Sequence, residues 1–507
     1  MFKKKHDYTV EITSIIFLAV LFFCWAAWGT FTGNDTDSYV NMDYQREMLY
    51  PLFLAAWRNI FGTSLMFKVA VLIQIFFTDY AVYRFMGFVT AKFELEPLRI
   101  IAGYALFAIM FIFPHFVTAT GLLTFTSILS EGIAIPFFIL FARHLMQAAM
   151  ERSYLRLWVA ITLAAVLSLT RSQFQYLFVA CLIVGVVTAL WGVRKFPKIL
   201  LTLAMTAAGI LVVFFMSHIY MFFITGNFTS ASSGSVTACA NILYVSDADD
   251  GNLIVDEGAR RVFESTYAGM KDRGVRMEDL DPSGLIDRAM AVEEAHDVIK
   301  YEAYELAVGS YLNDLGIMDY QERLQMKDVV AMKIAIPLLK AHLGEWVKNY
   351  AGLCVVGLIR SVAASPENVV MQILTIVVLL VAVIAFFYKK QDEDIRIYMG
   401  TILLLILGNV CATSLVIMCL SRYMIYNFAI FYIGLMIALT GKLSTKHPEK
   451  VREEKTKEKS REKTAIEKRA EMINKRSNEK KEEKSDGNDH DSFSEKILEH
   501  KKEEKED

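Results

Sequence analysis

The architecture follows from two consecutive stretches near the amino terminus: ITSIIFLAVLFFCWAAWGTFT at residues 12–32 and GNDTDSYVNMDYQREMLYPLFLAAWRNIFG at residues 33–62. The first stretch is apolar over about 20 residues, the length that an α-helix needs to cross a bilayer. The second stretch opens with polar residues that include Asp35, Asp37, Tyr39 and Arg46, and it then returns to apolar and aromatic sequence. We therefore expect these polar side chains to be held at the membrane surface, where they form a candidate site.

The whole chain has the composition of a membrane protein. It has 507 residues, of which 54% are hydrophobic and 12% aromatic. The predicted fold class is an all-α integral membrane protein with about ten transmembrane helices, near residues 12–32, 65–86, 100–116, 128–145, 157–169, 174–191, 199–224, 369–388, 398–418 and 424–439. No basic patch stands apart from the Lys and Arg that flank these spans, so no nucleic-acid partner is predicted.

The apolar runs divide the chain into four predicted parts. Residues 1–224 form an N-terminal transmembrane module with the first external loop at 33–63, and residues 225–345 form an external soluble insertion. Residues 346–444 contain the end of an interfacial, broken helical stretch that begins near residue 329, followed by the C-terminal transmembrane helices. Residues 445–507 form a charged tail that is either disordered or a solvated helix, because Glu and Lys alternate there with almost no apolar residues.

The basic residues set the predicted orientation. Lys3, Lys4 and Lys5 precede the first span, and clustered Lys and Arg recur in alternate loops. By the positive-inside rule both termini are cytoplasmic in a multi-pass protein of the cell membrane, and the 33–63 loop faces outside.

Three more charged residues are expected on the same outer face: Glu131 at the start of the fourth span, Arg171 at the turn after the fifth, and Arg422 before the last. Ionisable groups near hydrocarbon are costly unless they are paired or solvated, so their convergence indicates a cavity. Simpler explanations stay open. The arginines reach lipid headgroups, or Asp35 and Asp37 only cap a short helix.

These residue types suit a substrate with a lipid tail and a phosphate. The guanidinium group binds phosphate oxygens through paired hydrogen bonds and keeps its charge at any relevant pH. A carboxylate accepts the proton of an attacking hydroxyl as the new bond forms. Together the residues describe the displacement of a lipid phosphate by an alcohol.

The candidate residues lie in four motifs: DTDSY at 35–39, followed by Arg46 and LYPLFL at 49–54; SEGIA at 130–134; LTR at 169–171; and RYM at 422–424. In this order the motifs resemble the GT-C membrane glycosyltransferases, which include the protein mannosyltransferase and aminoarabinose transferase types. Where that superfamily often has Pro-Pro or Arg-x-Pro before the Tyr-Pro pair, this chain has REML at 46–49.

The resemblance implies an inverting glycosyltransferase with a polyprenyl-phosphate sugar donor. It implies Asp35 as the general base, with Asp37 as the second choice, and neither a metal nor a cofactor is predicted. The implied substrate-binding residues are Tyr39, Arg46, Glu131, Arg171, Arg422 and Tyr423. The expected partners are the polyprenyl-phosphate sugar donor and membrane lipid, and the acceptor, whether glycan, lipid or protein, is left open.

Other functions remain as alternatives. A polytopic transporter or flippase would place charges deep in its spans and break helices in corresponding halves. An envelope-polysaccharide polymerase or ligase would use external arginines without needing Asp35, and a membrane anchor for the tail would need none of these residues. The DADDGN run at 247–252 resembles a calcium loop only loosely, because Gly251 occupies a ligand position, and we interpret it as a turn.

Overall fold

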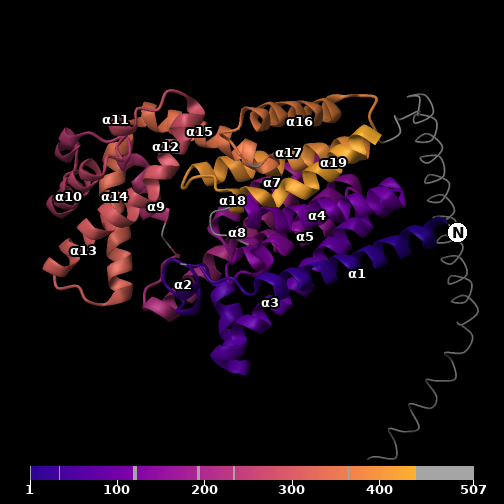
Figure 1. Ribbon diagram of the computed structural model, residues 1–507, viewed down its shortest axis with the longest axis horizontal. Helices are drawn as coiled ribbons and strands as arrows, with labels where there is room; N and C mark the ends of the chain where they lie inside the picture. The colour runs from indigo at the N-terminus through magenta and orange to yellow at the C-terminus, as the bar shows by residue number, and fades with distance from the viewer. Residues whose placement is uncertain are drawn as a thin grey trace, which may run out of the picture. The chain divides into compact units, whose positions relative to one another are not determined.

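The computed structural model describes residues 2–33, 35–117, 123–190, 195–231, 234–363 and 365–440 (Figure 1). Within these ranges helices are the only repeating elements, and one isolated bridge pairs Phe31 with Ser127. The tail predicted at 445–507 lies outside the described residues. The part described is therefore all-α, as predicted.

Nine helices of the described part are long and apolar enough to cross a membrane, which indicates a multi-pass membrane protein. They are α1 (Phe2–Trp28), α3 (Leu49–Phe93), α4 (Pro97–Val117), α5 (Glu131–Met150), α7 (Tyr176–Leu190) with the preceding turn η2 (Ser172–Gln175), α8 (Lys195–Thr225), α16 (Val369–Phe387), α17 (Glu393–Ser414), and α18 (Ser421–Met424) joined by η5 (Ile425–Asn427) to α19 (Phe428–Thr440). In Figure 1 they run roughly alongside one another, and α1 packs on α3 and α4 while α17 packs on α7 and α19.

The span predicted at 157–169 corresponds to a shorter helix, α6 (Tyr154–Ser168), which has 15 residues. At 1.5 Å per residue its length is about 22 Å, less than the hydrocarbon core of about 30 Å. The helix packs between α5 and α8, so neighbouring helices cover it. Nine predicted spans thus match helices of spanning length, and this one does not reach it.

Helix α3 is divided by a kink at Gly62, where φ is 74° and ψ is 169°. Only glycine adopts this backbone conformation without strain, so Gly62 separates the preceding 49–61 segment from the membrane-spanning part of α3. Within that segment, ring centroids of Tyr50, Phe53, Trp57 and Phe61 follow one another at 5.8, 6.1 and 6.0 Å. An aromatic row of this kind suits the membrane interface.

The insertion forms a second hydrophobic core of its own. Its elements are α9 (Gly234–Leu243), η3 (Ala248–Leu253), α10 (Glu257–Arg273), α11 (Met277–Leu280), α12 (Leu285–Asp297), the π-helical segment η4 (Val298–Tyr304), α13 (Glu305–Asp314) and α14 (Tyr320–Ala341). In Figure 1 these helices gather at one end of the long helices. The core also includes Leu353 and Val356, so it continues past the predicted boundary at 345.

The stretch predicted as broken at 329–361 forms the end of α14 and a continuous helix, α15 (Leu343–Val362). The glycines inside α15 permit close packing. A Cβ atom on Gly352 would lie 2.4 Å from the carbonyl oxygen of Leu285. At the other end of α15, Arg360 Nη1 donates to Glu293 Oε2 at 2.6 Å and to the carbonyl oxygen of Cys419 at 3.1 Å. Arg360 therefore joins the insertion to the C-terminal spans.

Candidate functional site

Four segments far apart in the sequence meet at one end of the long helices. The first loop, which contains the short helix α2 (Thr36–Val40), is fastened beside α5 by hydrogen bonds from Phe31 N to Thr126 O at 3.1 Å and from Ile128 N to Phe31 O at 2.9 Å. A further hydrogen bond from Leu49 N to Leu169 O at 2.9 Å joins the end of the loop to the end of α6. Three of the four motif-bearing segments are thereby brought together, and the fourth joins them through ion pairs of Arg422.

Five charged side chains form a connected cluster at this junction, here called the Asp35 cluster: Asp35, Arg46, Glu131, Arg171 and Arg422. Arg46 Nη2 lies 2.7 Å from Asp35 Oδ1, and Arg171 Nη1 lies 2.6 Å from Glu131 Oε1. Arg422 bridges the two pairs, at 3.7 Å from Asp35 Oδ2 and 3.9 Å from Glu131 Oε1. Three guanidinium groups thus face two carboxylates, which leaves one excess positive charge when both carboxylates are ionised.

Asp35 is positioned by this ion pairing and not by helix capping. It is the residue before α2, but its side chain makes no capping hydrogen bond. Burial acts to raise the pKa of Asp35, but the charges of Arg46, Arg422 and Arg171 and the hydrogen bond from Arg46 outweigh it, so that the pKa lies below its ordinary value. Asp35 is therefore an ionised carboxylate at neutral pH.

Glu131 is the first residue of α5, and its side chain is only 1% exposed. A carboxylate at this position is stabilised by the free N–H groups and the dipole at the start of the helix. Ser130 lies between the charges: its hydroxyl accepts from Arg171 Nη1 at 3.2 Å and donates to Glu131 Oε2 at 3.3 Å. Tyr39 OH lies 2.9 Å from the same Ser130 oxygen.

Two tyrosine rings support the arginines. The guanidinium of Arg46 lies 4.5 Å from the ring centroid of Tyr39. The ring of Tyr423 has Arg171 at 4.6 Å and Arg422 at 4.8 Å, and its hydroxyl accepts a 2.7 Å hydrogen bond from Arg422 Nη2. Such cation–π contacts hold a guanidinium in place without neutralising it.

Asp37 lies apart from the Asp35 cluster. It is exposed in the first turn of α2, and among the described residues its side chain makes no hydrogen bond or ion pair. Seven of the eight predicted site residues therefore lie together, and Asp37 does not join them. Their roles stay predictions.

A buried polar residue beneath the cluster was missed by sequence reasoning. Gln74 of α3 is fully buried, accepts from Tyr50 OH at 3.0 Å, and donates to the carbonyl oxygens of Phe125 and Ser127 at 3.2 and 3.0 Å. The ring of Tyr50 packs edge-on against Tyr39 at 5.1 Å. The presence of a glutamine inside a predicted span could have indicated this residue, because a polar side chain in a span requires hydrogen-bond partners.

Glu47 is a second carboxylate near the cluster, and its environment is opposite to that of Asp35. Burial raises the pKa of Glu47 to about 7, although a hydrogen bond from Ser217 Oγ to Glu47 Oε2 at 3.3 Å partly offsets the effect. No arginine lies within ion-pair distance of Glu47 in the described part. Glu47 faces α8 and not the arginines.

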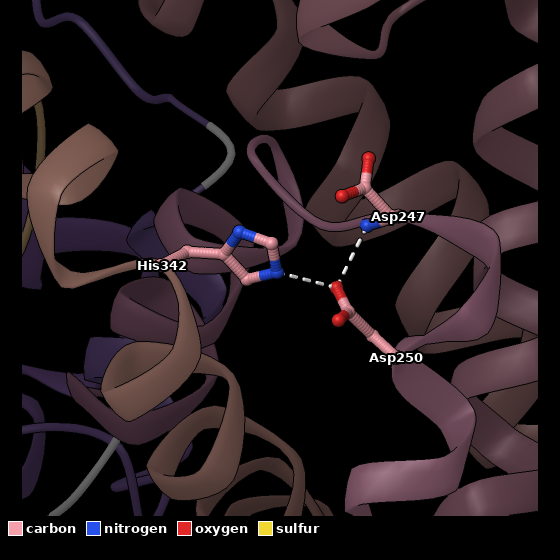
Figure 2. A group of neighbouring side chains, drawn as sticks. All are labelled: Asp247, Asp250 and His342. Carbon is pink, nitrogen blue, oxygen red and sulfur yellow. Dashed lines mark hydrogen bonds and ion pairs between the residues drawn. The ribbon is translucent and has the colours of Figure 1, made fainter.

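A separate group in the insertion has the donor types of a metal site. Figure 2 shows His342 Nε2 at 2.7 Å from Asp250 Oδ2, the same oxygen that accepts from the backbone N–H of Asp247 at 2.7 Å. One donor atom from each of the three side chains lies within 4.8 Å of the others. Asp247 and Asp250 also form a reciprocal capping box on η3, so these contacts belong to the capped turn that the sequence predicts at 247–252.

The fold and these contacts define a class: a multi-pass, all-α membrane protein with an arginine–carboxylate cluster where several spans begin or end. Comparisons with protein-family models, curated proteins and solved structures find no match to this chain. The Asp35 cluster is therefore the feature of the chain that bears most directly on its function.

Proposed function

We propose that this protein is a membrane glycosyltransferase that moves a sugar from a polyprenyl-phosphate donor to an acceptor hydroxyl on the outer face of the cell membrane, with both termini cytoplasmic. The observation that supports it best is the Asp35 cluster. Its arginines outnumber its carboxylates, and it lies at helix ends, where a phosphate carried on a lipid tail arrives from the bilayer.

Arg171 and Arg422 are the proposed phosphate ligands. Arg422 Nε is buried and has no hydrogen-bond acceptor within the described residues, and Glu131 Oε1, the nearest carboxylate oxygen, is 3.9 Å away. A phosphate oxygen would supply the missing acceptor. Glu131 and Tyr423 keep the two guanidinium groups in place before the donor binds, which reduces the reorganisation needed on binding.

In the proposed reaction the acceptor oxygen forms a bond to the anomeric carbon of the sugar. The bond between that carbon and the phosphate oxygen breaks, and its electron pair leaves with the polyprenyl phosphate, which the arginines stabilise. Asp35 receives the acceptor's proton. Because arginines lower its pKa, Asp35 is a weak base, and it accepts the proton as the hydroxyl becomes acidic during bond formation.

The test is release of polyprenyl phosphate by the purified protein in lipid, from a panel of polyprenyl-phosphate hexoses and with a panel of acceptors. We expect release by the wild type, a loss of 10²- to 10⁴-fold with Asp35→Asn, and near-normal release with Asp37→Asn, the exposed control in the same loop. Circular dichroism and size-exclusion chromatography establish that both variants are folded.

Each other outcome has a definite meaning. Equal release by the wild type and Asp35→Asn removes Asp35 as the base. Movement of the donor across the membrane without release of polyprenyl phosphate overturns the transferase proposal and favours a flippase. Polymer formation that Asp35→Asn leaves unchanged favours a polymerase.

A further inference from the structure

A cavity of about 560 Å³ lies at the opposite ends of the helices that carry the Asp35 cluster. It is formed by α1, α3 and α5. Tyr83 and Thr90 line it together with its charged and amide residues, which are Glu11, Arg84, Lys92, Arg143, Gln147 and Glu151. Arg143 is twelve residues after Glu131 on α5, about 18 Å along the helix axis. The cavity therefore faces the other membrane surface, the side that the basic loops predict to be cytoplasmic.

Arg143 at this cavity is buried without a counter-charge. It is 8% exposed, and no carboxylate of the described residues lies within 4 Å of its guanidinium. Its Nε atom has no hydrogen-bond partner, and its one hydrogen-bond contact joins Nη1 to His144 Nε2 at 3.2 Å. Removal of a guanidinium from water without a partner is strongly unfavourable, and an anion in the cavity would supply the missing counter-charge.

The neighbouring side chains favour an anion in the interior of the cavity. Gln147, one helical turn after Arg143, is 6% exposed, and its side-chain oxygen has no donor. An exchange of the oxygen and nitrogen positions by rotation of this amide would present its NH₂ group to an anion. Arg84 is exposed, and within the described residues it donates only to Tyr80 OH, at 3.3 Å. Lys92 is paired with Asp394 at 2.7 Å, so Arg143 and Arg84 provide the unpaired charge.

The two carboxylates of the cavity do not cancel this charge. Glu11 and Glu151 are both exposed. Glu151 lies 3.6 Å from Arg156 Nε, so its charge is shared with that arginine. Among the charged side chains that line the cavity, Arg143 is thus the one that is buried.

We propose that this cavity binds a phosphate group, carried either by the headgroup of an anionic phospholipid or by free phosphate. A guanidinium fork matches the geometry of phosphate oxygens, and anionic headgroups are available at the edge of the bilayer, where the cavity lies. The site is distinct from the Asp35 cluster and does not depend on the function proposed for that cluster.

The test uses full-length protein delipidated in neutral detergent. Thermal unfolding and native mass spectrometry are followed while phosphatidylglycerol, phosphatidylcholine or inorganic phosphate is added. We expect phosphatidylglycerol to raise the unfolding midpoint and to bind with one tight site, and phosphatidylcholine to do neither. Stabilisation by inorganic phosphate as well identifies a site for phosphate in general, whereas no effect of inorganic phosphate identifies a headgroup site.

The decisive variant is Arg143→Met, with Arg99→Gln as a matched loss of charge at the same membrane surface but outside the cavity. We expect Arg143→Met to weaken the tight site at least tenfold and Arg99→Gln to leave it unchanged. Without ligand, Arg143→Met should unfold no earlier than the wild type, because it removes an unpaired buried charge.

Equal phosphate-dependent stabilisation in the wild type and Arg143→Met overturns the proposal, as does no stabilisation of the wild type by either phosphate source. If Arg143→Met fails to fold, Arg143→Lys serves instead, because it keeps the charge but loses the fork. It is expected to bind phosphatidylglycerol more weakly than Arg99→Gln does, and equal binding contradicts the proposal.

Discussion

The arginines at the two ends of α5 differ in their ion pairing. At the N-terminal end Arg171 lies 2.6 Å from Glu131, and Arg422 approaches both Glu131 and Asp35. At the C-terminal end Arg143 is as buried as a core residue and has no carboxylate partner in the described part of the chain. A paired arginine is held in position before a ligand binds. A buried arginine without a partner lacks a counter-charge, which a bound anion would supply.

Loss of the Glu131 charge would make the N-terminal end of α5 resemble its C-terminal end. Glu131→Gln leaves Arg171 without its buried counter-charge, so we expect a loss of about 3–5 kcal/mol in the free energy of unfolding. Denaturant unfolding in detergent measures it. Glu151→Gln is the control at the other end of α5, because its exposed contact with Arg156 is worth at most about 1 kcal/mol. Equal stability of the two variants would contradict the role of the buried pair.

Glu47 is a carboxylate that has no arginine partner in the described part of the chain, unlike the paired Asp35. Its pKa of about 7 exceeds its ordinary value of 4.5, so the unfolded chain loses this proton first as the pH rises. The free energy of unfolding therefore falls as the pH rises from the lower of these two pKa values to the higher. Above the higher value the loss is on the order of 3 kcal/mol. Glu47→Gln should therefore be more stable than the wild type at about pH 8 and equal to it at about pH 4.

The measurement for Glu47 is denaturant unfolding of the wild type and Glu47→Gln at both pH values. Glu151→Gln, which replaces an exposed carboxyl, should follow the wild type at each pH. A Glu47→Gln variant that is less stable than the wild type at about pH 8 would show that the ionised carboxylate is stabilising.

The smallest expected effect concerns Tyr39 in the Asp35 cluster region. Its hydroxyl contacts Ser130, and its ring contacts Arg46. Tyr39→Phe removes the 2.9 Å contact with Ser130 but keeps the ring beside Arg46, so we expect a loss of about 1 kcal/mol. Tyr39→Ala removes both and should cost more. Denaturant unfolding of both variants, with exposed Tyr8→Phe as control, distinguishes the two contributions. Equal losses would show that the ring contributes nothing.

The spans could be predicted well from the sequence because a helix that crosses a bilayer must be long and apolar. Both properties can be read from consecutive residues. Sequence reasoning missed the short length of α6, which depends on cover from α5 and α8, and the kink at Gly62, which depends on a backbone angle. Nothing in the local pattern distinguishes that glycine from others in apolar runs.

The convergence of Asp35, Glu131, Arg171 and Arg422 was also predictable, because each adjoins the end of a predicted span and the predicted orientation places these ends at one surface. The contacts that join these side chains within that surface could not be predicted from the sequence. Glu47 reaches Ser217, and Arg143 is buried where other helices, α3 among them, pack on α5, only through tertiary packing. Asp35 and Asp37 differ by two positions in sequence, and only the fold separates the paired residue from the exposed one.

The bridging position of Arg422 has a consequence for biosynthesis. Chains are made from the N-terminus, so the Asp35–Arg46 and Glu131–Arg171 pairs can form once the first half of the protein has been inserted. Arg422 comes with the last described helices and joins the two pairs only then. The Asp35 cluster therefore matures in two stages, and a ribosome that stalls before the last span leaves a protein with two separate ion pairs and no complete site.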